Sequence, residues 1–167
     1  MIKFKPWPKI PRLENEIEIW TEKIDGTNAC VVIDEYGEIG AQSRNRLITP
    51  QNDNFEFASW VQTNKQDLLN LGPGHHFGEW WGKGIGRSYN QNEKIFSLFN
   101  THKWHNNEQK PTCCHVVPII SNHIPLTQQI QNLIKNGSLA KPGYMNPEGI
   151  IIFKLLTQTY YKLIINK

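Results

Sequence analysis

The chain has 167 residues, a net charge of +3 and no block of like charges, which predicts one domain with one buried core over residues 1–167. This mild positive excess permits a nucleic-acid partner without requiring one. Three cysteines give no disulfide framework, which predicts a reducing compartment and a cytoplasmic protein. No apolar run has the length of a signal peptide or a membrane span, so no membrane partner is expected.

Regular elements follow one another without an internal repeat or a low-complexity linker. Alternating polar and apolar residues predict strands, and apolar residues at helical spacing predict two principal helices. The expected fold class is α+β, with mixed, mainly antiparallel sheets and flanking helices. In the first half we expect a proline-stiffened lead-in at residues 1–13, with Phe4 and Trp7 packed against the body. Strands are expected at 16–20, 29–34 and 38–43. A helix should follow, with Asn52 or Asp53 as its cap and its end at Gly72. In the second half we expect strands at 76–81 and 94–100, a helix at 127–136 stopped by Gly137, and strands at 148–153 and 159–165.

Lys23 stands where the first predicted strand ends, followed by Asp25 and Gly26. An amine is nucleophilic only without its proton, and a free lysine titrates near ~10.4, so a nucleophilic lysine needs burial or neighbouring positive charge. The alternative is a charged hairpin corner, with Gly26 in a left-handed turn and Lys23 in water. Taken alone, the motif favours the corner.

Histidines and cysteines gather between residues 102 and 115, where a zinc site is conceivable. Adjacent cysteines are a poor tetrahedral pair, and their spacing from His102 and His105 matches no common zinc template. Loop and core roles are therefore the preferred interpretation for Cys113, Cys114 and His115.

Other polar residues stand at the ends or midpoints of the predicted strands, where pockets are built. Cations for a phosphate, a carboxylate for a divalent metal and a ring for a base are the components of a nucleotidyl-transfer site. Arg46 and the cations of the glycine-rich loop at residues 82–87 are candidates for contacts with nucleic-acid phosphates. The polar residues concerned are Lys23, Asp25, Arg44, Glu79, Glu148 and Lys162.

Six short motifs occur in the order Lys23-Ile24-Asp25-Gly26-Thr27-Asn28, Ser43-Arg44-Asn45, Phe77-Gly78-Glu79, Ile95-Phe96-Ser97-Leu98-Phe99-Asn100, Glu148-Gly149-Ile150-Ile151-Ile152 and Tyr161-Lys162-Leu163. In this order they resemble the motifs of the covalent nucleotidyltransferase superfamily of polynucleotide ligases and capping enzymes, and within it the ATP-dependent RNA ligases. The resemblance covers nearly the whole chain. It implies a minimal catalytic domain that joins RNA 5′-phosphate and 3′-hydroxyl ends, with ATP and Mg²⁺ or Mn²⁺ as cofactors.

The resemblance also implies a role for each matched residue. Lys23, Glu148 and Lys162 would be catalytic, with Lys23 as the nucleophile that forms lysyl-AMP and Lys162 touching the α-phosphate. Glu148 and Asp25 would serve the metal ion, and the sequence leaves open whether Asp25 orients Lys23 or a metal-bound water. Nucleotide contacts are implied for Glu22, Lys23, Ile24, Asp25, Asn28, Arg44, Glu79, Phe99, Glu148, Lys162 and Lys167, with Arg44 and Glu79 on the ribose, Phe99 stacked on adenine and Glu22 accepting from the adenine amino group.

The last motif departs from the family pattern. The family carries two lysines one residue apart, whereas Ile164 stands at the second position here. Lys167 replaces that lysine only if the terminus bulges, because residues 162 and 167 point to opposite faces of a regular strand. No C-terminal oligonucleotide-binding domain is expected either.

Several alternatives therefore stay open. The chain is also compatible with a noncatalytic nucleotide- or RNA-binding module, a DNA ligase, or an mRNA-capping-type nucleotidyltransferase. The sequence leaves open the preferred RNA structure, the oligomeric state and whether a helper protein supplies binding of the substrate ends.

Overall fold

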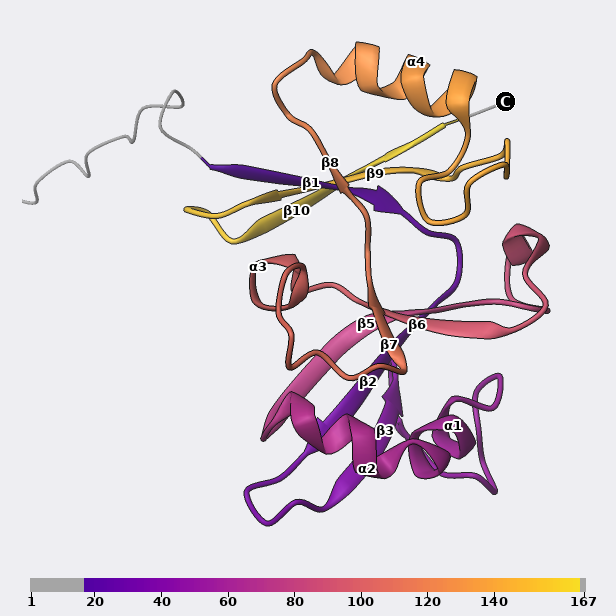
Figure 1. Cartoon of the computed structure of the whole chain (residues 1–167), viewed down its shortest axis with the longest axis vertical. Coiled ribbons are helices and arrows are strands. Elements are labelled where there is room, and N and C mark those ends of the chain that lie inside the picture. The colour runs from indigo at the N-terminus through magenta and orange to yellow at the C-terminus, as the bar shows by residue number, and fades with distance from the viewer. Residues whose placement is uncertain (1–16, 166–167) are drawn as a thin grey trace, which may run out of the picture.

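Two β-sheets form the centre of the computed structural model, which describes residues 17–165. Helix α4 (Leu126–Asn136) covers the outer face of the smaller sheet, while α1 (Phe57–Thr63) and α2 (Lys65–Leu68) lie at the other end of the molecule against the larger sheet (Figure 1). The predicted α+β class, with mainly antiparallel sheets and flanking helices, is confirmed. Three expectations fall outside the described residues. They concern the lead-in with Phe4 and Trp7, the first residue of the first predicted strand, and Lys167.

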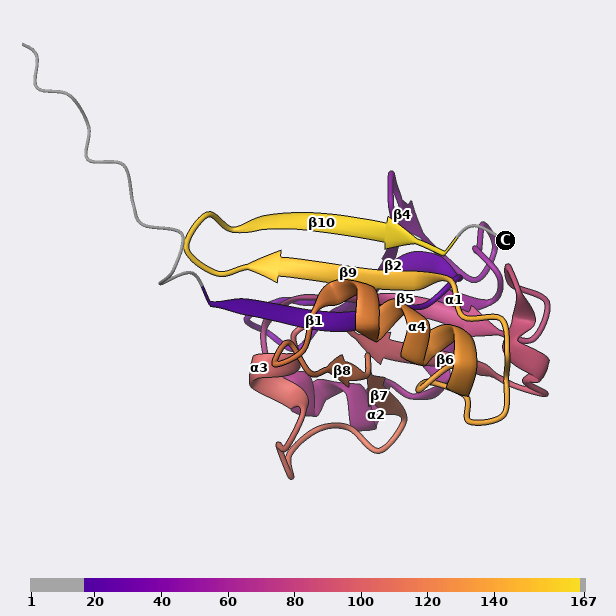
Figure 2. The same cartoon turned by 90° about the horizontal axis from the view of Figure 1, so that it is seen from above.

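The smaller sheet contains four antiparallel strands in the order β10-β9-β1-β8. Side chains alternate across it, so Trp20 and Ile150 face α4 and form a core with Leu133. Lys23 has the opposite parity and lies on the face turned away from α4. Helix α4 ends at Gly137 with φ +83°, as its sequence predicts. The strands are β1 (Glu18–Lys23), β8 (Ile119–Ile120), β9 (Gly149–Lys154) and β10 (Thr159–Ile164), and Figure 2 shows β9 and β10 as a hairpin at one edge.

The larger sheet contains six strands in the order β4-β3-β2-β5-β6-β7, and every pair is antiparallel except β6 with β7. One face carries Val31, Trp80 and Phe96, which form the main core with Phe57 and Val61 of α1. Residues of the opposite parity, which include Asn28 and Glu79, occupy the other face. The strands are β2 (Thr27–Ile33), β3 (Ile39–Ser43), β4 (Leu47–Ile48), β5 (Gly74–Gly82), β6 (Lys94–Leu98) and β7 (Cys114–Val116).

The helix predicted after Asp53 is correct in position but broken in form. It divides at Asn64 into α1 and α2, and a 3-10 turn at Leu69–Leu71 follows before Gly72. Asp53 does satisfy its N-terminus, because the carboxylate accepts hydrogen bonds from the backbone N–H groups of Ala58 and Ser59 at 2.7 and 2.9 Å.

Two short segments differ in secondary structure from the sequence-based assignment, which placed the end of a strand at residue 100 and no strand at residues 114–116. The strand expected over residues 94–100 ends at Leu98, and Asn100 instead caps the short helix α3 (Thr101–Trp104). Cys114 belongs to β7 and is buried in the main core, in agreement with the preferred core role. Within residues 17–165, no helix is long and apolar enough to cross a membrane.

Candidate functional site

Lys23 and Glu148 meet where β1 ends and β9 begins. Residues Lys23 and Gly149 are directly opposite in the antiparallel register, so Glu148 emerges beside the lysine. Lys23 Nζ lies 2.6 Å from Glu148 Oε2, and the two side chains are only 22% and 14% exposed. The interpretation of Lys23 as a surface corner in water is therefore wrong.

Gly26 is required because neighbouring chains approach closely, rather than for a left-handed turn. It is not among the glycines with positive φ, but a Cβ added there would lie 2.5 Å from the carbonyl oxygen of Trp80. This approach brings the Gly26 N–H to Glu79 Oε1, at 3.0 Å. The turn after Lys23 is thereby joined to β5.

Glu79 is a buried carboxyl beside three other charged groups. Burial raises its pKa to about 7, while the Lys23 charge and the Gly26 N–H oppose that rise. The negative charges of Glu148 and Asp25 raise it further. These mutual effects place Lys23, Glu79, Glu148 and Asp25 in one electrostatic cluster.

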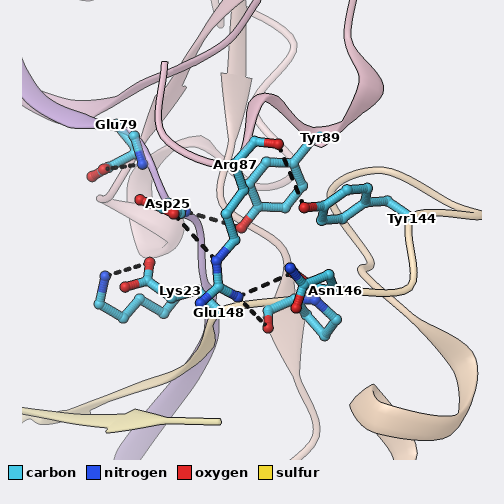
Figure 3. A network of polar contacts seen from close by, with 10 residues as sticks. Lys23, Asp25, Glu79, Arg87, Tyr89, Tyr144, Asn146 and Glu148 are labelled. Atoms are coloured by element: carbon cyan, nitrogen blue, oxygen red, sulfur yellow. Dashed lines mark hydrogen bonds and ion pairs between the residues drawn. The ribbon is translucent and has the colours of Figure 1, made fainter. Parts of the chain in front are cut away.

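Asp25 is held by Arg87 (Figure 3). Arg87 Nε lies 3.2 Å from Asp25 Oδ2, and the backbone N–H of Asp25 donates to the Tyr89 hydroxyl at 2.9 Å. The sequence left open whether Asp25 orients Lys23 or a metal-bound water. In the structure its described ion pair is with Arg87.

Arg87 also binds the segment that leads into Glu148. Its Nη1 donates to the carbonyl oxygens of Asn146 and Pro147 at 3.1 and 2.8 Å (Figure 3). The guanidinium therefore connects the Lys23 motif with the Glu148 motif. Nε and Nη1 of Arg87 thus have partners inside the protein, and the expected contact between the cations of the loop at residues 82–87 and nucleic-acid phosphates stays a prediction.

The residues that support Arg87 were not recognised in the sequence. Tyr89 is fully buried, and its ring lies 4.6 Å from that of Tyr144, whose hydroxyl donates to the Arg87 carbonyl at 3.4 Å. The φ angles of Ser88, Tyr89 and Asn90 are +55°, +50° and +51°, values that side chains other than glycine rarely adopt. The glycine-rich loop before them was the only sequence signal, and it does not show which residues the loop meets.

Glu22 has a structural role that the sequence did not predict. The residue is 1% exposed, and its carboxylate accepts hydrogen bonds from Ser138 Oγ and from the backbone N–H groups of Leu139 and Ala140. Burial raises the pKa of Glu22, and these three donors oppose the rise. The implied adenine contact stays a prediction, and it would have to coexist with these bonds. Ile24 is likewise buried, in a cluster with Trp81 and Tyr89.

Asn28, Arg44 and Phe99 come together at the larger sheet, on the side opposite the main core. They line one hollow of about 200 Å³, together with Phe77 and four further residues of β2 and β3. Glu79 is the register partner of Asn28, so the same face continues toward Lys23. A larger hollow of about 1130 Å³ lies at α3 and β8 and is lined by none of the candidate site residues.

Arg46 does not belong to this group. Its guanidinium donates to the carbonyl oxygens of Asn52 and Asp53 at 2.9 and 3.4 Å. These bonds shape the loop before α1, so the expected phosphate contact of Arg46 is not supported.

The last motif places Lys162 on the same face as Lys23. Ile164 lies opposite Gly149 in β9, and Gly149 lies opposite Lys23 in β1. Lys162 is two residues from Ile164 along β10, and its side chain is exposed. The position of the family's second lysine is therefore in the same row as Lys23, and isoleucine occupies it.

Glu148 and Asp25 are the two candidate metal ligands. Among residues 17–165, no group of three or more His, Cys, Asp and Glu side chains is arranged to hold a metal. Mg²⁺ commonly takes only one or two protein carboxylates and completes its shell with water and substrate phosphate. Each of the two carboxylates already has a cationic partner, Lys23 for Glu148 and Arg87 for Asp25, so both metal assignments stay predictions.

Comparison with known proteins gives the family. No curated protein matches the chain. Among solved structures, a Glu-to-Ala variant of the Naegleria gruberi RNA ligase with ATP and Mn is similar, with a TM-score of 0.63, 21% identity and coverage of 99% of this chain and 58% of that chain. A Lys-to-Ala variant of the same ligase with ATP and Mn gives a TM-score of 0.61 and 21% identity, with coverage of 88% of this chain and 48% of that chain. The chain therefore spans about half the length of these structures, and the likeness shows the fold. Because the family model described as RNA ligase matches residues 17–155, the chain belongs to the RNA ligase family.

Proposed function

We propose that the protein is an ATP-dependent RNA ligase that joins RNA 5′-phosphate and 3′-hydroxyl ends through lysyl-AMP and RNA-adenylate intermediates. The observation that carries this proposal is the 2.6 Å ion pair between Lys23 and Glu148, which unites two motifs from opposite ends of the chain. Family membership supports RNA ends as the substrate, and the ATP in the similar Naegleria gruberi structures supports ATP as the nucleotide.

In the first step, Lys23 Nζ attacks the α-phosphorus of ATP. A P–N bond forms, the bond from the α-phosphorus to the bridging oxygen breaks, and pyrophosphate leaves. The ammonium group must lose one proton before the attack and a second as the P–N bond forms. Glu148 Oε2 lies close enough to hold the amine and to accept the first proton.

The adenylyl group then moves to RNA. An oxygen of the RNA 5′-phosphate attacks the phosphorus of lysyl-AMP, the P–N bond breaks, and the Lys23 nitrogen takes up one proton to leave as the amine and a second to return to the ammonium form. In the last step the RNA 3′-hydroxyl loses its proton and attacks the 5′-phosphate, which releases AMP and forms the phosphodiester. We assign Asn28, Arg44 and Phe99 to the adenosine, because they line one hollow on the sheet face that also carries Glu79.

A divalent cation, Mg²⁺ or Mn²⁺, would neutralise negative charge on the phosphate oxygens when bound. Glu148 is the residue we assign to hold it, and Lys162 adds positive charge from the neighbouring strand face. Asp25 acts through Arg87 in this assignment and positions the loop that follows Lys23.

Covalent labelling tests the proposal. Incubation with Mg²⁺ and ATP radiolabelled in the α-phosphate should leave acid-stable label on the protein, and Lys23→Ala should abolish it. Glu148→Gln should slow labelling by about 10²- to 10⁴-fold, the usual contribution of a positioned proton acceptor. Lys83→Ala is the matched control, because Lys83 is an exposed lysine of the neighbouring loop. Absence of label from ATP, GTP and NAD alike would remove the enzymatic assignment.

A noncatalytic nucleotide- or RNA-binding module is the second candidate. Ile164 favours it, because this residue stands in the row of Lys23 where the family carries a lysine. This candidate predicts binding of nucleotide or RNA without covalent label. Preferential labelling by GTP would indicate a capping-type enzyme, and sealing of nicks with DNA rather than RNA on the 3′-hydroxyl side would indicate a DNA ligase.

A further inference from the structure

The β9–β10 hairpin presents a surface that continues the site away from Lys23. Tyr160 lies opposite Phe153, Lys162 opposite Ile151, and Ile164 opposite Gly149. Directly opposite residues of antiparallel strands point to the same side of the sheet. Tyr160 and Lys162 therefore share the face of Lys23, which is the face turned away from α4.

Tyr160 and Phe153 form an exposed aromatic step on this face. Their ring centroids lie 4.5 Å apart with an interplanar angle of 29°, and Tyr160 is 69% exposed. Phe153 supports one side of the tyrosine ring and holds it in place. The exposed ring is thus available to stack on a flat, unsaturated partner.

Lys162 lies between this aromatic step and Lys23. Along β10, Lys162 is two residues from Tyr160 and two residues from Ile164, which lies level with Lys23 across the sheet. Tyr160 is therefore four residues, or about 14 Å, along the strand from the level of Lys23. Within residues 17–165, Lys162 makes no hydrogen bond or ion pair, which leaves its charge available. Neither β9 nor β10 contains a carboxylate.

The opposite face of the same hairpin is different. There Lys154 pairs with Glu18 at 3.4 Å and lies 5.8 Å above the ring of Tyr161. The lysine and the tyrosine on the α4 side thus have partners within the sheet. The adjacent residues Tyr160 and Tyr161 therefore point to opposite faces of the same sheet.

We propose that the face formed by Phe153, Tyr160 and Lys162 binds a single-stranded segment of the RNA substrate, with an unpaired base stacked on Tyr160 and the strand running from there past Lys162 toward Lys23. The inference rests on the proposed RNA ligase function and extends it to the path of the RNA strand. An aromatic ring beside a lysine, on two strands that contain no carboxylate, matches what single-stranded nucleic acid requires. This face, which we call the Tyr160 platform, lies a few nucleotides from the reacting end and outside the nucleotide pocket.

The test measures RNA binding directly, by fluorescence anisotropy with a 5′-phosphorylated single-stranded RNA oligonucleotide. Tyr160→Ala should weaken binding about tenfold, because base–aromatic stacking contributes an effect of that order. Tyr160→Phe keeps the ring and should bind like the wild type. Tyr161→Ala is the matched control and should also bind like the wild type, because its ring lies on the other face.

Labelling by ATP separates this inference from the proposed function. Tyr160→Ala should form lysyl-AMP at the wild-type rate and transfer it to RNA more slowly. If the wild type takes up no label but its RNA binding still depends on Tyr160, the ligase proposal fails and the platform stands.

Three results would overturn the platform: wild-type RNA affinity in Tyr160→Ala, an equal loss in Tyr161→Ala, or an equal loss with a blunt RNA duplex, whose bases are not free to stack. Conversion of a dimer to a monomer by Tyr160→Ala, with RNA binding unchanged, would instead assign the surface to a second copy of the chain.

Discussion

Arg87 forms an ion pair with Asp25, with Nε 3.2 Å from Oδ2, and thereby connects the loop after Lys23 with the loop before Glu148. The same guanidinium binds the carbonyl oxygens of Asn146 and Pro147. Lys23 and Glu148 therefore owe their alignment partly to a third segment of the chain, which joins the loops next to them.

Arg87→Met tests this connection. The substitution keeps much of the aliphatic side chain and removes the ion pair and both hydrogen bonds. Hydrogen bonds to charged groups contribute about 1.5–3 kcal/mol each, and Arg87 is partly exposed, so we expect the free energy of unfolding to fall by about 2 kcal/mol. Covalent labelling by ATP should slow about tenfold, because misalignment of reacting groups lowers the rate steeply.

Lys83→Met is the control for Arg87→Met, because it removes an exposed cation from the same loop without breaking a described contact. Urea denaturation and the labelling rate are measured for both variants. Wild-type labelling by Arg87→Met would show that the connection does not align Lys23 with Glu148.

Glu79 gives the protein a defined pH dependence of stability. Burial raises its pKa to about 7 from 4.5, so between these values the folded protein retains a proton that the unfolded chain has released. Stability therefore falls as pH rises through this window, and about 2.5 pKa units correspond to about 3 kcal/mol. Glu79→Gln keeps an oxygen for the Gly26 N–H and removes the titration.

Urea denaturation at pH 4.5 and at pH 8 checks the prediction for Glu79. The wild type should lose about 3 kcal/mol more than Glu79→Gln between the two values. Parallel changes in the two proteins would mean that Glu79 titrates normally in the folded state.

Gly149 allows β10 to pass close to β9. A Cβ added there would lie 1.9 Å from the carbonyl oxygen of Leu163, so Gly149→Ala must displace the strand that carries Lys162. We expect a loss of about 1–3 kcal/mol in the free energy of unfolding and slower covalent labelling. Gly40→Ala is the control, because a Cβ at Gly40 meets nothing within 4 Å. Similar melting temperatures for the two variants would contradict the steric argument.

Ile164→Lys restores the family pattern in the last motif. Residue 164 is one strand beyond Gly149 from Lys23, a separation of about 10 Å across the sheet. A cation there favours the neutral form of a neighbouring amine, so the pH–rate profile of labelling should move toward lower pH. Tyr161→Lys adds the same charge on the opposite face and should leave the profile in place. A shift of equal size in both variants would point to net charge rather than position.

Local sequence patterns predicted most of the strands and the stop of α4 at Gly137. They did not predict the break between α1 and α2 or the end of β6 at Leu98, because such boundaries depend on what each turn contacts in the folded chain. The six motifs predicted which residues gather, and the structure brings Lys23 to Glu148 and Asn28 to Arg44 and Phe99.

By itself, the sequence determined the fold class, the resemblance to RNA ligases and the identity of the candidate nucleophile, because these depend on residue order and local periodicity. Only the tertiary structure decided that Arg87 pairs with Asp25, that Glu22 is hydrogen-bonded to Ser138, and that Tyr160 shares the face of Lys23. The physical reason is that hydrogen bonds and strand register join residues distant in the chain, and each side chain's partner is fixed only when the sheets assemble.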